Sequence, residues 1–129
     1  LYKENDEILP VNKYAWSKLG GECAVTQHTN HLIIRTSIGS LIFPYDEAFV
    51  DMWTSKDTVN VIAPLILKAT KSNLNGIINI GTKRKNMFEY ANKLNSDVKK
   101  ATRNEFGDET VFDTSFDNSK FTSFLNNDK

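Results

Sequence analysis

Two short apolar runs are the clearest feature of the hydropathy pattern along this chain. Residues 32–37 pass from three aliphatic side chains into Arg35, Thr36 and Ser37, and residues 76–81 place three isoleucines between two glycines. Such runs are typical of strands buried on both faces of a parallel sheet. We therefore predict two parallel strands here. The polar end of the first should open into a cleft, because ligands of open α/β sheets bind beyond the carboxyl ends of the strands.

Helical spacing of apolar residues marks the segments around these strands. Asn12 is a candidate N-cap for the first helix and Ser55 for the second, and Pro64 should distort the second from inside. The helices are predicted at about 13–27, from Ser55 through Leu67, at 87–95 and at 119–125.

The remaining stretches have no clear period. Residues 39–54 read as a loop with a short strand near 49–52, and residues 98–106 as a short edge strand. Aromatic side chains of the loop could stack on a base or a sugar, or could belong to the core, which is the favoured interpretation. They are Phe43, Tyr45, Phe49 and Trp53.

A pair of glycines interrupts the first predicted helix. Gly20 and Gly21 each cost roughly 0.5–1 kcal/mol relative to alanine in a helix interior. The pair is either a tolerated weakness or the point where another element approaches the helix backbone closely. We favour the close approach, because nothing else in the sequence offsets the cost.

Composition excludes several classes of function. Lys+Arg and Asp+Glu both number 16, so nothing suggests a nucleic-acid binder held by bulk positive charge. Cys23 is the single cysteine, which excludes an internal disulfide and fits a reducing compartment such as the cytoplasm. No apolar run approaches a membrane span, and no signal peptide is visible. His28 and His31 have the spacing of a helical metal site, but their polar surroundings favour a surface loop, and we predict no metal.

The richest candidate chemistry lies on the first predicted helix. Tyr14 and Lys18 are four residues apart, so a helix places both side chains on one face. An ammonium group beside a phenol favours the phenolate form. A tyrosine tuned in this way can give or take a proton near neutral pH.

The same stretch resembles a known family. Tyr14 and Lys18 form a Tyr-x-x-x-Lys pattern that runs into Leu-Gly-Gly-Glu at 19–22, which is similar to the signature of extended short-chain dehydrogenases/reductases acting on nucleotide sugars. Within that family the similarity is greatest to the dTDP-4-dehydrorhamnose reductase branch. Arg35-Thr36-Ser37 resembles the family's Arg-Thr-Ser-Trp strand end, although Ile38 stands in place of the tryptophan, and residues 113–120 resemble its Asp-x-Ser-Leu-Asp-x-Ser-Lys run.

The resemblance implies a Rossmann-type α/β fold, of which residues 1–129 would be the C-terminal half with the catalytic helix and the substrate-binding part. The glycine-rich dinucleotide fingerprint and the upstream Ser/Thr of the catalytic triad are absent from the sequence. The chain begins with Leu1 rather than Met, and we expect an N-terminal nucleotide-binding half to complete it. The resemblance also implies a homodimer through the helix that bears Tyr14 and Lys18.

The implied reaction is the NAD(P)-dependent reduction, epimerisation or dehydration of a nucleotide-linked keto sugar. Tyr14 would be the acid/base and Lys18 its tuner and ribose ligand, and both would contact NAD or NADP. The other implied contacts are Arg35, Thr36 and Ser37 with the cofactor, and Ile38, Lys83 and Arg84 with the sugar nucleotide. Ile38 stands where the family's tryptophan contacts the sugar, and the basic turn of Lys83 and Arg84 is either a solvated charged loop, which is the favoured interpretation, or an anion site.

Two alternatives stay open beside the enzyme. One is a non-catalytic relative that binds the nucleotide sugar or cofactor or serves as a regulatory subunit, which Ile38 and the missing half would explain. The other is a small α/β interaction domain in which Tyr-x-x-x-Lys occurs by chance. The reaction direction, the sugar and the choice between NADH and NADPH are not readable from these residues.

Overall fold

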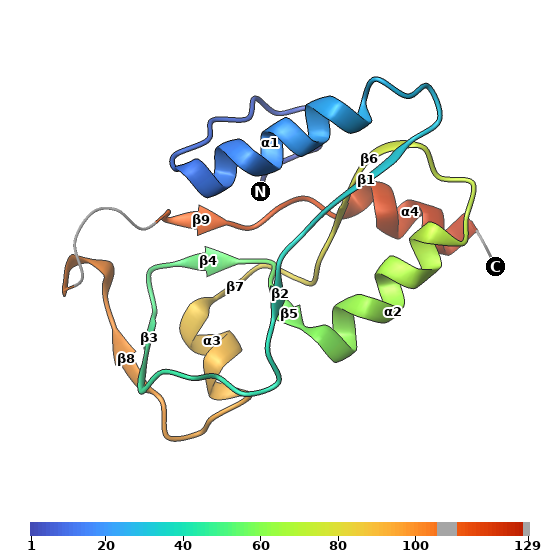
Figure 1. Cartoon of the computed structure of the whole chain (residues 1–129). Helices are drawn as coiled ribbons and strands as arrows, with labels where there is room; N and C mark the ends of the chain where they lie inside the picture. The colour runs from blue at the N-terminus through green and yellow to red at the C-terminus, as the bar shows by residue number, and fades with distance from the viewer. Residues whose placement is uncertain (106–110, 128–129) are drawn as a thin grey trace.

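The centre of the fold is a pair of parallel strands that are far apart in the sequence. In the computed structural model, which describes residues 1–105 and 111–127, β1 (Leu32–Thr36) pairs in parallel with β6 (Gly76–Ile80), with Ile34 opposite Ile78. Figure 1 shows the two strands crossing the middle of the molecule, with helices on both sides. The predicted parallel pair is confirmed.

Short elements surround this pair. Within the part of the chain that the structure describes, the helices are α1 (Lys13–Val25), α2 (Val59–Thr70), α3 (Met87–Asn92) and α4 (Ser119–Asn127). The other strands are β2 (Ile38–Gly39), β3 (Glu47–Phe49), β4 (Trp53–Thr54), β5 (Asp57–Thr58), β7 (Lys85–Asn86), β8 (Lys99–Ala101) and β9 (Asp113–Thr114), with a 3₁₀ turn at Arg103–Glu105.

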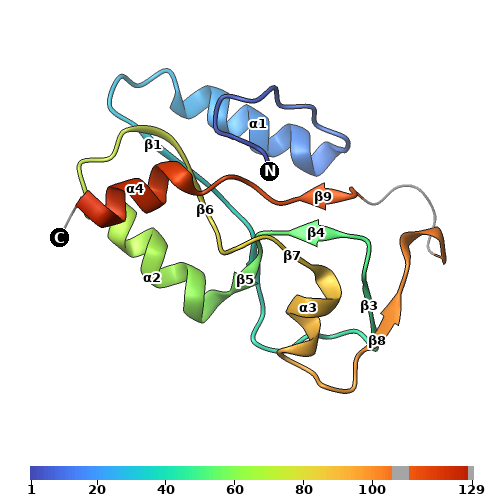
Figure 2. The same cartoon turned by 180° about the vertical axis from the view of Figure 1, so that it is seen from behind.

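Alternate residues of the central strands face different layers. Ile78 and Ile80 are buried with Ala69 of α2 and Phe121 of α4, so these two helices cover one face of the pair. The next residue between them, Asn79, is buried and faces the N-terminal segment. Figure 2 shows α2 and α4 side by side, with α1 on the other side of β1. The alternation follows from the two-residue period of a strand.

A second core lies in the part of the chain that holds β3, β8 and α3. Phe43, Ala48, Tyr90, Ala91 and Val98 are buried together there. Helix α3 begins at a capping box, in which the Asn86 side chain accepts from the Glu89 N–H and the Glu89 carboxylate accepts from the Asn86 N–H. Strand β7 leads directly into α3, and it forms a three-stranded sheet with β4 and β9.

The structure corrects several local predictions. Helix α2 begins after Thr58, while Ser55 is fully buried and donates to the Phe116 carbonyl instead of capping a helix. The single strand predicted near 49–52 is replaced by β3 and β4 on either side of it. The edge strand predicted at 98–106 is β8, which is shorter, and Phe106 lies outside the described residues.

The explanation offered for the glycine pair is also wrong for the described part of the chain. A Cβ built on Gly20 or Gly21 would meet no described atom within 4 Å beyond its own helix neighbourhood. No other described element therefore approaches the backbone of α1 at these positions. The helix is capped at its start, where the Asn12 side chain accepts a hydrogen bond from the Ala15 N–H. None of the described helices is long and apolar enough to span a bilayer.

Candidate functional site

Tyr14 and Lys18 are together on α1, as their spacing predicts. The Lys18 Nζ lies 5.1 Å from the centre of the Tyr14 ring. The Tyr14 side chain is exposed, at 71% of its full accessibility, and Lys18 is exposed too. A phenol and an ammonium group are thus presented as a pair to whatever lies against this side of α1.

Arg35 joins this helix to the central strands. Its Nε donates to the Glu22 Oε1 at 2.9 Å and its Nη2 to the Glu22 Oε2 at 2.7 Å, while its Nη1 donates to the Glu4 carbonyl at 3.1 Å. The hydrogen bond with Glu22 raises the pKa of Arg35 above its ordinary value against the opposing effect of burial, and the charges of Glu22 and Glu4 add to the rise. The guanidinium is thus engaged with α1 and the N-terminal segment, and its contact with a cofactor stays a prediction.

The residues that follow Arg35 lie at the carboxyl end of β1. Thr36 Oγ1 is buried and has no hydrogen-bond partner among the described residues. Ser37 is half-buried, and Ile38 is 45% exposed at the start of β2. An orphaned buried hydroxyl is uncommon, because such groups lose their hydrogen bonds to water. Thr36 is therefore the described polar group that is best placed to gain a partner at this strand end.

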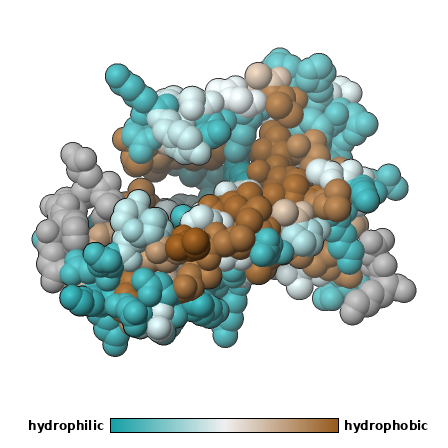
Figure 3. All heavy atoms as spheres, turned by 60° about the horizontal axis from the view of Figure 1, so that its bottom comes forward, coloured by the Kyte–Doolittle hydropathy of each residue, from teal (hydrophilic) through white to brown (hydrophobic). Residues whose placement is uncertain are grey.

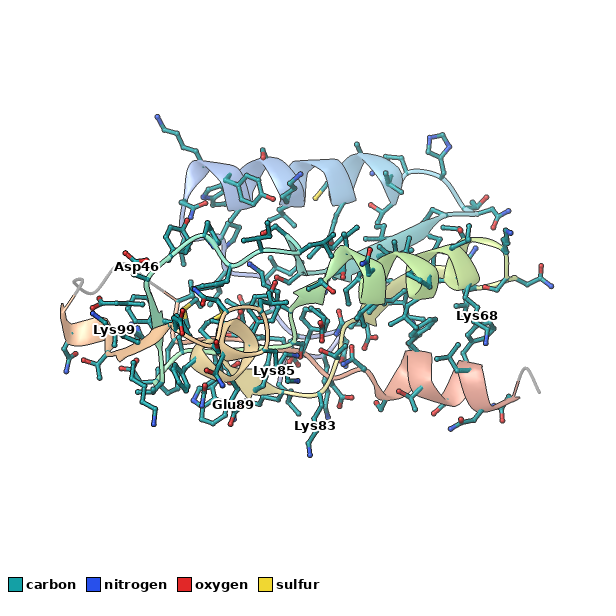
Figure 4. The ribbon with its side chains drawn as sticks, turned by 90° about the horizontal axis from the view of Figure 1, so that it is seen from below. Asp46, Lys68, Lys83, Lys85, Glu89 and Lys99 are labelled. Atoms are coloured by element: carbon teal, nitrogen blue, oxygen red, sulfur yellow. The ribbon has the colours of Figure 1, made fainter. Side chains whose placement is uncertain are left out.

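The basic turn after β6 lies elsewhere. Figure 4 shows Lys83, Lys85 and Glu89 on the side of the molecule away from α1. A pocket of about 420 Å³ opens among them, lined also by Trp53, Arg84 and Lys93. The structure therefore does not bring the predicted contacts Lys83 and Arg84 together with Tyr14.

Arg84 is held by an acidic partner and an aromatic ring. It donates twice to the Asp113 Oδ2, at 3.1 Å from Nε and 2.9 Å from Nη2, and its guanidinium carbon lies 3.9 Å from the Trp53 ring centre. Burial pushes the pKa of Asp113 upward, but hydrogen bonds from Ser115 and Arg84 hold it below its ordinary value. Only Lys83, which is exposed, keeps the character of a solvated basic residue.

Lys85 is a buried lysine beside this turn. Its Nζ lies 3.5 Å from the Asp57 Oδ2 and also donates to the Thr82 hydroxyl and the Lys83 carbonyl. Burial lowers the pKa of Lys85, and the negative charge of Asp57 only partly opposes that effect. The sequence predictions gave Lys85 no role of its own, because burial of a lysine depends on neighbours that the local pattern does not show.

A further pocket was not predicted as a site. It measures about 580 Å³ between β3, β8 and α3, and Figure 4 shows Asp46 and Lys99, which belong to its lining, on one side of the molecule. Phe43 is buried, as the core interpretation predicts, but Tyr45 is 67% exposed. The cluster of aromatic residues was visible in the sequence. The hydropathy pattern alone, however, could not tell which of these residues are buried and which are exposed.

The two histidines form no metal site. His28 and His31 lie in the loop after α1, where the His31 Nδ1 is 2.6 Å from the His28 carbonyl oxygen. Within residues 1–105 and 111–127, no group of His, Cys, Asp or Glu side chains could hold a metal ion.

Comparison with solved structures identifies the fold. One match is a hypothetical dTDP-4-dehydrorhamnose reductase from Sulfolobus tokodaii, with a TM-score of 0.74 and 26% sequence identity over 96% of this chain. The fold is similar to part of the dTDP-4-dehydrorhamnose reductase fold. A second reductase of this name, from Bacillus anthracis str. Ames in complex with NADP, matches with the same TM-score at 24% identity over 95% of this chain.

The dTDP-4-dehydrorhamnose reductase fold is only partly present here. The chain spans about half the length of the solved structures that it matches, 52% of one and 53% of the other. The match confirms the resemblance and the mixed α/β fold with parallel strands. No protein-family model and no curated protein matches the sequence.

Proposed function

We propose that this chain is the catalytic-helix and substrate-binding half of an NAD(P)-dependent reductase of a nucleotide-linked keto sugar. The observation that carries the proposal is the pair of Tyr14 and Lys18 on α1, in a chain whose fold matches one half of dTDP-4-dehydrorhamnose reductases. Epimerisation or dehydration of such a sugar is the related chemistry that the same pair could serve. We place the enzyme in the cytoplasm, in keeping with its single cysteine.

Tyr14 would exchange the proton at the sugar oxygen. A phenol that donates as charge develops on a carbonyl oxygen supplies general acid catalysis, which typically contributes about 10²–10⁴-fold in rate. The Lys18 ammonium stabilises the phenolate that remains, because an opposite charge close by favours the ionised form. Tyr14 is exposed on α1, so its hydroxyl is free to meet a substrate.

The residues present fit a dinucleotide cofactor in part. Lys18 is exposed and could bind a ribose hydroxyl, and the orphaned Thr36 Oγ1 could gain a partner at the end of β1. A bound nicotinamide would supply the hydride. Ser37 and Arg35 remain proposed contacts, the latter through donor capacity that Glu22 and Glu4 leave over.

The other half of the cofactor site would come from an N-terminal nucleotide-binding half. Among the described residues β1 pairs only with β6, which leaves its other edge for a further strand. A parallel sheet of only two strands is rare, because parallel strands are normally buried within a larger protein core. Helix α1 exposes Trp16, and α2 exposes Val61 and Leu67. Figure 3 shows apolar side chains gathered across one face of the molecule, beside a hollow.

Substrate contacts are proposed at two separate places, at the end of β1 and on the basic turn after β6. Ile38 is exposed where the sugar would lie, and Lys83 is exposed on the basic turn. Arg84 would act on the substrate only through release from Asp113, so it is the weaker of the two basic candidates. A homodimer through α1 is also proposed, because none of the side chains of this helix is fully buried among the described residues.

The test is turnover by the protein produced from its complete gene, with NADPH and NADH consumption followed in the presence of dTDP-4-keto sugars. Tyr14→Phe removes the hydroxyl and keeps the ring, and we expect kcat to fall about a hundredfold or more. The control is Tyr2→Phe, the same change at another exposed tyrosine. Unchanged turnover in Tyr14→Phe would end the assignment.

A non-catalytic relative is the second candidate, favoured by one observation. Ile38, where the family has tryptophan, is 45% exposed and offers a smaller apolar surface to a sugar ring. Calorimetry separates the two candidates. Binding of NADP and of a dTDP-sugar without any turnover would favour the binding role, whereas turnover that needs Tyr14 excludes it.

A further inference from the structure

Little of the surface of helix α1 is buried against the rest of the described chain. None of its side chains is fully buried among the described residues, and Ala15, Leu19 and Glu22 are its half-buried positions. Its polar link to the central strands is the double hydrogen bond from Arg35 of β1 to Glu22. Among the described residues, this double bond is a specific side-chain link that fixes α1 against β1.

The spacing along α1 connects this link to the candidate chemistry. Tyr14, Lys18 and Glu22 are successive residues at intervals of four, and each such step turns by only about 40° around a helix of 3.6 residues per turn. The three side chains therefore lie along one slowly turning stripe. Whatever fixes the direction of Glu22 also fixes the direction of Tyr14.

We propose that Glu22 is a positioning residue: its two-pronged bond with Arg35 sets the rotation of α1, and thereby aims Tyr14 and Lys18. The inference rests on the proposed function and adds a role for an acidic residue that the chemistry itself does not use. A single hydrogen bond would leave the helix free to pivot. Two parallel bonds to one carboxylate, of 2.9 and 2.7 Å, restrict both distance and rotation.

The anchor on the strand side is itself fixed. The Arg35 Nη1 donates to the Glu4 carbonyl, and the Glu4 side chain accepts from the backbone N–H of Asn79 in β6 at 2.9 Å. Arg35 belongs to β1, and Glu4 of the N-terminal segment links its guanidinium to the backbone of β6. The guanidinium is thus tied to both central strands. The side chains of Glu22 and Arg35 are each only 21% exposed, so water competes weakly for the bond.

The competing explanation is an ordinary stabilising ion pair. Exposed pairs contribute little and their loss has little effect on a neighbouring site. That explanation predicts a lower melting temperature for a variant, with full kcat per folded molecule. Positioning predicts the opposite balance: a lower kcat while most of the fold is intact.

The experiment uses the complete protein and the variant Glu22→Gln, which keeps the shape and removes the charge, with Glu7→Gln as the control at an exposed glutamate. Well below the melting temperature we expect kcat to fall about tenfold or more, with the KM for NADPH changed less than threefold. Hydrogen exchange of the α1 amides should rise at least tenfold, while the amides of β6 keep their protection. Glu22→Asp should recover part of the rate.

Arg35→Lys tests the two-pronged geometry, because lysine keeps the charge without the fork. It should lose as much kcat as Glu22→Gln, and the double variant should lose no more than either single variant. Full kcat in Glu22→Gln, or unchanged exchange in α1, would overturn the positioning role. If the parent protein shows no turnover the proposed function fails by itself, and the exchange result still decides whether the pair holds α1.

Discussion

The Lys18 Nζ lies over the ring of Tyr14, 5.1 Å from its centre. A cation above an aromatic face is attracted to the ring, and when exposed such a contact is worth about 0.5–1 kcal/mol. The same closeness lets the ammonium group stabilise a phenolate during proton transfer. The position of Lys18 over the Tyr14 ring thus serves two purposes. It orients the two side chains relative to each other, and it brings a positive charge close to the oxygen that becomes negative during proton transfer.

The first prediction follows from this contact. Lys18→Met keeps an extended side chain but removes the charge, so kcat of the complete protein should fall about tenfold or more, where each tenfold equals about 1.4 kcal/mol of barrier. The affinity for NADPH should fall as well, through loss of the proposed ribose contact. Steady-state kinetics and cofactor titration measure the two effects. Lys13→Met, at an exposed position of the same helix, is the matched control and should leave both values unchanged.

A second prediction contrasts two glycines. A Cβ on Gly39 would collide with the Tyr90 hydroxyl oxygen and lie 2.9 Å from the Tyr90 Cζ, and Tyr90 is buried. Gly39→Ala should therefore destabilise the protein by about 1–3 kcal/mol through overpacking. Gly20→Ala meets open space inside a helix and should stabilise by about 0.5–1 kcal/mol. Urea unfolding with a helical and a tertiary probe compares the two, and a destabilised Gly20→Ala would show that something covers α1 there.

These glycines also show how far the sequence could predict the fold. The parallel strands β1 and β6 were predictable, since an aliphatic run ending in polar residues or glycine is a local signal. The pairing of Tyr14 with Lys18 was predictable too, because helix periodicity alone places them. Gly20 and Gly21 could not be interpreted, because the space beside a helix is set by elements that are distant in sequence.

The same limit applies to the charged residues of the candidate site. Arg35 was expected to face a ligand because it ends a strand, yet Glu22, on the preceding helix, and Glu4 accept its hydrogen bonds. Arg84 was grouped with Lys83, yet it meets Asp113 from a segment that begins beyond β8. Charge and position in a turn were visible in the sequence, whereas the partner of each guanidinium depends on the folded arrangement.

The third prediction concerns acid stability at Asp113. The pKa of Asp113 is lowered in the fold, although burial opposes this, by hydrogen bonds from Ser115 and Arg84. A carboxylate whose folded pKa is depressed stabilises the fold above its unfolded pKa of about 4, and that contribution is lost as the pH falls through the lower folded value. Asp113→Asn should therefore cost about 1–3 kcal/mol at pH 7 and progressively less below about pH 4. Urea midpoints across this pH range, with Asp46→Asn as an exposed control, measure the difference.

The last prediction tests how the N-terminal segment is joined to the core. Asn79 is 1% exposed, and its Nδ2 donates to the Tyr2 carbonyl at 3.1 Å and to the Asp117 carbonyl at 3.2 Å. Asn79→Ala would leave both carbonyls without this donor and open a small cavity, so we expect a loss of about 2–4 kcal/mol. Asn75→Ala removes an amide that bonds to Asn30 at an exposed site and should cost less than about 0.5 kcal/mol.

The two asparagine variants should differ in where they loosen the fold as well as in how much. Because Asn79 joins the first residues of the chain to the start of α4 across β6, its loss should speed hydrogen exchange in residues 2–4 and 115–119 together. In Asn75→Ala both segments should keep their protection. Faster exchange in only one of the two segments would contradict a bridging role for the Asn79 amide. Glu4 would then remain as the main link between the N-terminal segment and the strands on which Arg35 and α1 depend.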